Sequence, residues 1–241
     1  MRISRTLTLT AAFAAAALTL SSVPAHAVSI SPAMVADAYS VMLNTTQAKL
    51  VGIGKENVSN FGVANSTKGS PDAPCLCQLS GSTLIKGSGA QDLISSQVLS
   101  LDGDNVTTIG QEVHWFANEK KAKKAYDLLV QKIKACEGQH TQTPDSNNDT
   151  SLTITRKITN SEKKAKDGDT FLWVNSETIL GDPTANFSDH SYTTFRLFGN
   201  YIQVLDLETE GNNAPALTKK QMNATDLLTD SLGDAWRGKF M

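Results

Sequence analysis

The chain has 241 residues, of which 40% are hydrophobic and 19% charged, and its formal net charge at pH 7 is -2. A chain of this length can bury one sizeable core, so a single domain is expected. The acidic balance argues against a nucleic-acid partner, because such partners require a basic protein surface.

The first 27 residues have the three parts of a secretory signal peptide. Two early arginines give a positive start, the stretch 7–20 is apolar and rich in alanine, and residues 25–27 read AHA, a small-x-small cleavage pattern. The apolar run is shorter than the roughly 20 residues that a membrane span needs. We therefore expect a signal peptide at 1–27 and one secreted domain at 28–241, with no membrane span.

The first half of the expected domain combines a helix, an irregular stretch and strands. Pro32 follows a capping serine and predicts a helix over 32–43. Residues 52–74 are rich in Gly, Asn and Ser, so they are expected to be irregular. The pattern then predicts strands between 77 and 116, with a turn at 102–105.

The clearest helical pattern covers 119–137, with Asn118 as its cap and Gly138 closing it. Its apolar positions step by four and three residues, which predicts one face packed on a sheet. These positions are Ala122, Tyr126, Leu129, Ile133 and Cys136. Six lysines lie largely off this stripe, and we interpret them as a solvated face, with contact to an anionic envelope polymer as the weaker alternative.

The last third of the chain is predicted to be mostly strand. Residues 139–150 look like a polar loop, followed by strands near 152–158 and at 170–180. A hairpin is expected over 189–209, with a two-residue turn at Gly199-Asn200. The final helix is expected over 219–236, because Thr218 and Gln221 form a capping box. Strands joined by hairpins favour an α+β fold: an antiparallel sheet with helices packed on it.

The three cysteines are Cys75, Cys77 and Cys136, all in the expected exported part. Disulfides persist in exported proteins, so one bridge and one free thiol are the simplest interpretation of an odd number. We expect Cys136 to pair with Cys75 or Cys77 and leave that choice open. A metal site is the weaker alternative, since no second metal-spaced pair is present. No metal and no cofactor are expected.

The block 111–138 resembles a known family. It reads QEVHWFA over 111–117 and NEKKA over 118–122, and it ends in IKACEG. This block resembles the extracellular sensor domain of the mycobacterial receptor kinase PknH and its secreted or lipid-anchored stand-alone relatives. The resemblance implies an α+β fold with a cleft, a ligand-sensing role, and Cys75 as the position of the partner of Cys136. The family's second cysteine pair is missing here, and Cys77 is extra.

The sequence gives no catalytic signature. It contains no G-x-S-x-G, H-E-x-x-H, Walker or G-x-G-x-x-G motif. The one pairing that resembles a thiol hydrolase is Cys77 with His114, and a leftover thiol beside a surface imidazole is the more ordinary interpretation. We therefore predict that the protein is not an enzyme and keep an unrecognised hydrolase as the weakest alternative.

One face of the expected hairpin carries a candidate ligand site. If Gly199-Asn200 is the turn, Tyr192, Arg196, Tyr201 and Gln203 share a face that mixes aromatic and polar groups. Such a face can cover a helix or line a cleft. In the second case these four residues bind the ligand, and Arg196→Ala is expected to abolish binding with little loss of stability.

These observations lead to one main hypothesis and one principal rival. The main hypothesis is a secreted, monomeric, sensor-like domain that binds a small molecule or an envelope component in a cleft of the sheet. The rival is a secreted domain that binds another protein through its surface and takes no small-molecule ligand. A deep pocket favours the first, and a flat apolar patch favours the second.

Overall fold

The computed structural model describes residues 32–54, 57–64, 89–90, 92–142, 153–180 and 187–241. Their elements are, in chain order, α1 (Pro32–Val41), α2 (Thr45–Ala48), the 3-10 helix η1 (Lys49–Val51), β1 (Asn57–Ala64), β2 (Asp92–Asp102), β3 (Asn105–Trp115), α4 (Glu119–Ala135), β4 (Gly138–Gln142), β5 (Ile154–Lys164), β6 (Thr170–Leu180), β7 (Phe187–Phe198), β8 (Tyr201–Asn212) and α5 (Lys219–Phe240).

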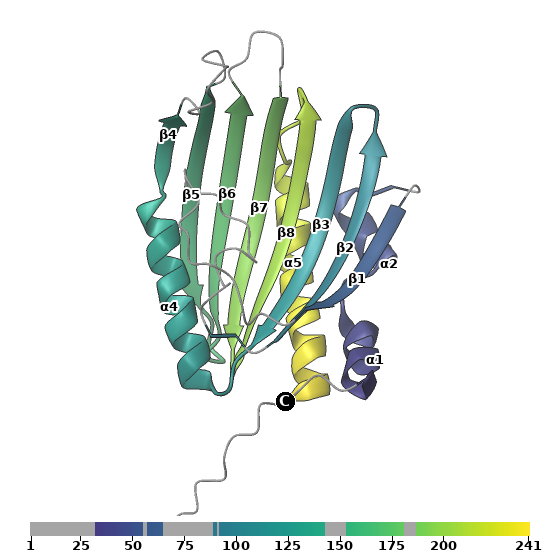
Figure 1. Cartoon of the computed structure of the whole chain (residues 1–241), viewed down its shortest axis with the longest axis vertical. Helices are drawn as coiled ribbons and strands as arrows, with labels where there is room; N and C mark the ends of the chain where they lie inside the picture. The colour runs from purple at the N-terminus through teal and green to yellow at the C-terminus, as the bar shows by residue number, and fades with distance from the viewer. Residues whose placement is uncertain (1–31, 55–56, 65–88, 91, 143–152, 181–186) are drawn as a thin grey trace, which may run out of the picture.

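The described strands form one eight-stranded sheet in the order β1-β2-β3-β8-β7-β6-β5-β4. All of its neighbouring strands run antiparallel. Helix α4 lies in front of the β4–β5 side of the sheet in Figure 1, and α5 lies behind the central strands. The expected α+β fold, an antiparallel sheet with helices on it in a single domain, is confirmed.

The two faces of the sheet bury different helices. Leu205 and Leu207 of β8 pack with Leu228 and Leu232 of α5, on what we call the α5 face. Helix α1 lies on this same face, since its Ala38 belongs to the same buried cluster as Val113 and Trp236. Successive side chains of a strand point to opposite faces, so the other residues of β8 lie on the opposite side.

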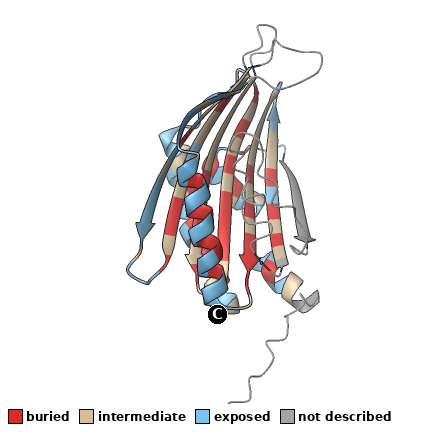
Figure 2. Cartoon of the chain, turned by 60° about the vertical axis from the view of Figure 1, so that its left-hand side comes forward, coloured by how far each residue is buried: buried red, intermediate tan, exposed pale blue. Residues whose placement is uncertain are grey.

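That opposite side, the α4 face, is covered by α4 over part of its area. Ile202 and Val204 of β8 pack there with Tyr126, Leu129 and Ile133 of α4. Figure 2 shows buried residues concentrated in the central strands and along one side of the helix at the front. The remainder of the α4 face mixes polar groups with exposed or half-buried apolar ones, such as Leu99 and Leu101 of β2, and it carries one of the two candidate sites described below.

Helix α4 forms where its capping and apolar pattern predicted. The Asn118 side chain accepts the backbone N–H of Lys121 at 3.0 Å, which satisfies a free N-terminal donor. Gly138, after the helix, has a φ of 111°, a conformation that favours glycine. Four of the five predicted apolar positions are buried, and Cys136, at the C-cap, packs partly buried against the core.

The β7–β8 hairpin has the predicted register. Phe198 pairs with Tyr201 and Arg196 pairs with Gln203, so Gly199-Asn200 is the turn, and Gly199 has a φ of 53°. Asn200 accepts the backbone N–H of Phe116 and donates its side-chain amide to the carbonyl of Phe116. These bonds fix the hairpin tip against the start of α4.

Two predictions of irregular structure were wrong. Strand β1 lies inside the stretch 52–74, and β4 begins the stretch 139–150. Both are edge strands, and each pairs on one side with a longer neighbour, β2 or β5. Strand β4 has few strand-forming residues, and in β1 the strand formers Val58, Phe61 and Val63 are interrupted by Asn, Ser and Gly, so the backbone bonds to the neighbouring strand decide both.

The final helix starts as predicted and runs further than predicted. Thr218 and Gln221 form the capping box, and α5 continues to Phe240. No helix in the described parts of the chain is both long enough and apolar enough to cross a membrane. The expected signal peptide and the segment with Cys75 and Cys77 lie outside the described residues, so both remain predictions.

Candidate functional site

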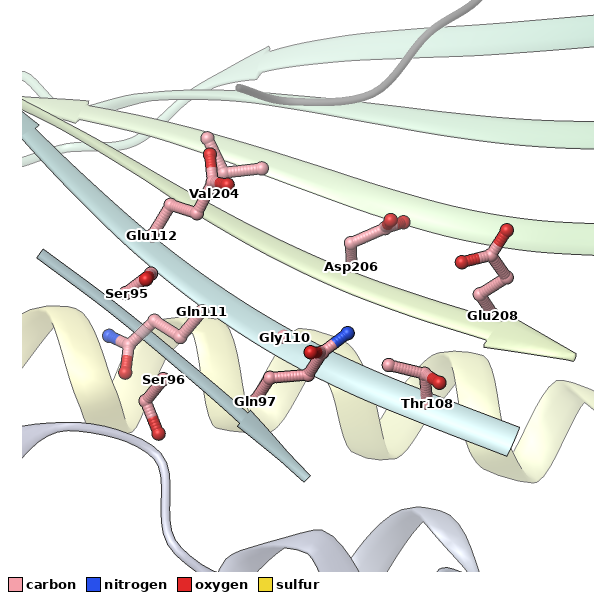
Figure 3. A pocket seen from close by; sticks show the side chains of 10 residues that line it. All are labelled: Ser95, Ser96, Gln97, Thr108, Gly110, Gln111, Glu112, Val204, Asp206 and Glu208. Atoms are coloured by element: carbon pink, nitrogen blue, oxygen red, sulfur yellow. The ribbon is translucent and has the colours of Figure 1, made fainter. Parts of the chain in front are cut away.

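A polar hollow opens on the part of the α4 face formed by β2, β3 and β8. It has a volume of about 210 Å³. Figure 3 shows Glu112, Asp206 and Glu208 projecting from β3 and β8, away from α5. We call it the acidic hollow. It is lined by Ser95, Ser96, Gln97, Thr108, Gly110, Gln111, Glu112, Val204, Asp206 and Glu208.

The hollow exists because a central strand lacks a side chain at one position. Gly110 of β3 stands between Gln97 and Asp206 in the sheet register. A Cβ placed on Gly110 would find its nearest neighbour, the Ser96 carbonyl oxygen, 3.9 Å away. A side chain would therefore fit at this position. The hollow is present because residue 110 is a glycine, and no backbone strain requires a glycine there.

Three carboxyl groups line this hollow, and two more lie near Glu208 on adjacent strands. Glu112 lies on β3, Asp189 on β7, and Asp206, Glu208 and Glu210 on β8. Asp189 stands directly opposite Glu210 in the register, and like charges in that position repel. Thr193 donates its hydroxyl to Asp206 at 2.6 Å, which partly offsets the burial of that carboxylate.

Burial and mutual repulsion change the protonation of these groups. Burial raises the pKa of Asp206 to about 6. Burial, followed by repulsion from Asp189, Asp206 and Glu210, raises the pKa of Glu208 to about 8. Glu208 is therefore mainly protonated at neutral pH, and its carboxyl shares a hydrogen bond with Asp189, whose own pKa is raised mainly by burial.

The raised pKa of Glu208 predicts a specific loss of stability with rising pH. The folded state keeps the Glu208 proton up to about pH 8, whereas the unfolded state loses it near the ordinary glutamate pKa of 4.5. The folded state thus binds more protons across this window, and the free energy of unfolding falls as the pH rises through it. Glu208→Gln keeps the neutral form, so it should match the wild type near pH 4 and exceed its stability above pH 8 by about 1–2 kcal/mol, allowing for partial solvent screening.

Urea unfolding at a series of pH values measures this difference. Glu137→Gln, at an exposed position after α4, is the matched control and should leave the pH dependence unchanged. A Glu208→Gln protein with the same pH dependence as the wild type would contradict the assignment of the proton to Glu208.

The four residues predicted to bind a ligand share one face, as expected, and α5 lies directly over them. The Tyr192 hydroxyl donates to Asp226 of α5 at 2.9 Å. The Gln203 amide donates to the Thr229 carbonyl of α5 at 3.3 Å. The sequence left two roles open for this face, packing against a helix or lining a cleft. Tyr192 and Gln203 pack against helix α5.

Tyr201 also contacts α5, through an aromatic cluster. Its ring meets Trp236 edge-on, with 6.0 Å between centroids, and stacks on Phe198 at 5.7 Å. Trp236 in turn packs against Phe240, at 4.4 Å. Tyr201 therefore helps to hold the end of α5 on the sheet, and ligand binding by this residue stays a prediction.

Arg196 is buried, with 3% of its side chain exposed, and its donors are bound within the protein. The guanidinium donates to Asp169 at 2.9 Å and to Asp234 at 2.7 Å. It also donates to the Asp230 carbonyl at 2.8 Å. Its carbon lies 5.2 Å from the ring centroid of Phe171, on the sheet. This arrangement joins α5 to the turn between β5 and β6.

Beside Arg196, a second pocket opens between α5 and strands β5 and β6. Its volume is about 320 Å³, larger than that of the acidic hollow and within the range of small-molecule sites. We call it the aromatic pocket. It is lined by Lys163, Ala165, Asp167, Phe171, Trp173, Arg196, Asp230 and Asp234. Arg196 is the single predicted ligand residue in this lining.

Sequence reasoning missed the other residues of the aromatic pocket. Asp230 and Asp234 are four positions apart on α5 and therefore share one helix face, a spacing visible in the sequence. Phe171 and Trp173 alternate on β6 with the buried Leu172. The pairing of β6 with β7, which places Phe171 opposite Arg196, had no sequence signal.

Within the described ranges, no group of three or more His, Cys, Asp or Glu side chains is arranged to hold a metal ion. His114 bonds to Glu112 at 3.0 Å, and His140 bonds to the Cys136 carbonyl at 2.9 Å. The suggested pairing of Cys77 with His114 falls partly outside the described residues.

The predicted disulfide can be tested by counting thiols. A bridge from Cys136 to Cys75 or Cys77 leaves one reactive thiol in the unfolded wild-type protein, and Cys136→Ser leaves two. Because a bridge restricts the unfolded chain, we expect Cys136→Ser to lower the free energy of unfolding by about 2–4 kcal/mol. Single Cys75→Ser and Cys77→Ser variants identify the partner, and three thiols in the wild type would refute the bridge.

Comparison with known proteins gives one informative likeness. No family model and no curated protein matches the chain. The crystal structure of the extracellular domain of PknH from Mycobacterium tuberculosis superposes with a TM-score of 0.53 at 16% identity, covering 81% of this chain and 94% of that one. At this identity the likeness shows the fold alone.

A second solved structure has a lower score. It is an uncharacterized protein (Rv0999 ortholog) from Mycobacterium smegmatis, with a TM-score of 0.35 and 9% identity, covering 83% of this chain and 96% of that one.

Proposed function

We propose that this protein is a secreted, non-catalytic binding domain that takes a small molecule or an envelope component in the aromatic pocket. The observation that carries the proposal is the pocket itself, of about 320 Å³, where two aromatic side chains meet charged groups from α5 and β5. Pockets that combine an apolar surface with a few polar groups are typical ligand sites.

Two further observations support this proposal. The fold resembles that of the extracellular domain of a receptor kinase, a domain that lies outside the cell. The chain also begins with the pattern of a secretory signal peptide. Together they favour a role in the envelope or outside the cell, and binding over catalysis.

Native mass spectrometry of the protein recovered from its producer's medium tests the proposal. We expect a monomer that carries a discrete extra mass, and we expect Asp230→Ala to lose that mass. The Asp230 carboxylate has no hydrogen bond or ion pair in the described structure, so this variant should fold normally. Asp127→Ala, on the exposed side of α4, is the control that should keep the adduct. A bare wild-type monomer that also binds nothing in a ligand screen would contradict the proposal.

A further inference from the structure

Two stacked aromatic rings, both held in place, border the aromatic pocket. The rings of Phe171 and Trp173 are stacked, with centroids 5.7 Å apart and an interplanar angle of 16°. The Trp173 indole N–H donates to Asp226 of α5 at 2.7 Å, which holds the ring in place. Phe171 is buried, whereas Trp173 is half-buried and borders the pocket. Such a surface favours a ligand with a flat apolar face.

The two walls of the pocket present opposite hydrogen-bonding groups. On the α5 side, Asp230 and Asp234 stand one helical turn apart and offer carboxylate oxygens as acceptors. On the β5 side, the exposed Lys163, which stands opposite Phe171 in the register, offers an ammonium donor. Both carboxylates are exposed at the mouth of the pocket, and Asp234 already accepts a hydrogen bond from Arg196.

The charged groups of the lining oppose an anion most strongly, and Lys163 opposes a cation. An anion in the pocket would face the carboxylates of Asp167, Asp230 and Asp234. A cation would face Lys163, whereas the Arg196 guanidinium is already paired with Asp169 and Asp234. A neutral molecule with hydroxyl groups meets neither repulsion, because a hydroxyl both donates to a carboxylate and accepts from an ammonium group.

We propose that the aromatic pocket binds a single pyranose ring, with one face of the sugar on Trp173 and its hydroxyl groups directed to Asp230 and Lys163. This inference rests on the proposed function, since it names the ligand class of the same pocket. The ring is either a free monosaccharide or the terminal unit of an envelope polysaccharide, because both present the same face and the same hydroxyl groups.

Tryptophan fluorescence gives a direct readout of occupancy. The chain has three tryptophans, and Trp115 and Trp236 are only 5% and 2% exposed. Acrylamide quenching of the folded protein therefore reports mainly on Trp173. We expect at least one sugar among glucose, galactose, mannose, arabinose and N-acetylglucosamine to protect Trp173 from quenching, at concentrations up to about 50 mM for a weak single-ring site. Trp173→Phe should abolish the protected component.

Variants of Asp230 separate a sugar from a cation. Asp230→Asn keeps an acceptor oxygen and loses the charge, so sugar affinity should fall by roughly 3-fold, whereas Asp230→Ala should weaken it about 10-fold or more. A cationic ligand would instead lose affinity to a similar extent in both variants. Asp127→Ala on α4 is again the control that should bind as the wild type does.

The outcomes are distinct. Protection by a monosaccharide assigns a free sugar, and protection by solubilised envelope polysaccharide alone assigns a terminal unit. No protection by either preparation overturns the pyranose inference. If the native protein carries an adduct that depends on Asp230 but is not a sugar, the pyranose inference is wrong and the proposed binding function is supported. If no adduct and no ligand depend on Asp230, both fall.

Discussion

Replacing Arg196 by leucine is expected to lower the free energy of unfolding by about 3–5 kcal/mol, the usual loss when one partner of a buried ion pair is removed. The guanidinium is 3% exposed and bonded to Asp169 and Asp234. It also lies between Phe171 and Phe198, 5.2 Å and 5.4 Å from their ring centroids. Leucine leaves the buried Asp169 carboxylate with Arg237 as its remaining cationic partner among the described residues. It also removes the link between α5 and the β5–β6 turn.

Two further variants make this prediction specific. Arg237 binds the same Asp169 but is 33% exposed, so Arg237→Leu should cost only about 1 kcal/mol. Arg196→Lys keeps the charge and loses the forked geometry of the guanidinium. Its free energy of unfolding should therefore lie between those of the wild type and Arg196→Leu. Chemical unfolding measures all three. Equal losses for Arg196→Leu and Arg237→Leu would contradict the structural role of Arg196.

This expectation reverses the one drawn from the sequence. From the pattern alone, Arg196→Ala was expected to abolish ligand binding with little change in stability. The donors of Arg196 are bound to Asp169, Asp234 and α5 carbonyls, so replacing this residue is now expected mainly to lower the stability of the fold. A loss of binding in that variant would therefore not identify a ligand contact, which is why Asp230 is the better test.

Gly233→Ala is expected to lower the free energy of unfolding by about 2–3 kcal/mol through overpacking. A Cβ at Gly233 would collide with the Arg196 guanidinium and come within 2.7 Å of the Gln203 amide oxygen. Both side chains are buried, and Arg196 is held in position by its ion pairs. Helix α5 can approach the sheet this closely only because position 233 has no side chain.

The same helix provides the matched control for Gly233. A Cβ added at Gly238 would have no atom within 4 Å, so Gly238→Ala should be neutral or stabilise by up to about 1 kcal/mol through helix propensity. In an Arg196→Leu background the cost of Gly233→Ala should shrink, because the colliding group is gone. An undiminished cost in the double variant would show that the collision with Arg196 is not its source.

Local patterns were sufficient for most elements of this fold. Asn118 with the apolar steps that follow it predicted α4, and Thr218 with Gln221 predicted the start of α5. The glycine at 199 predicted the β7–β8 turn and therefore the register that pairs Arg196 with Gln203. Capping, periodicity and turn geometry act over a few residues, so the sequence displays them directly.

What the sequence could not decide was which surfaces meet. Edge strands β1 and β4 depend on a neighbouring strand for their hydrogen bonds, and their own residues carry no clear strand pattern. The polar face of β7 and β8 was compatible with a cleft or with a helix, and the packing of α5, permitted by Gly233, placed a helix there.

Both candidate sites arise in the same way. The acidic hollow needs Gly110 of β3 beside Asp206 and Glu208 of β8, and the aromatic pocket needs β6 beside α5. The helices α4 and α5 and the β7–β8 hairpin could be predicted from the residues alone, because their capping, periodicity and turn signals are local. The tertiary structure alone decided the sites and the role of Arg196, because these depend on contacts between segments far apart in the chain.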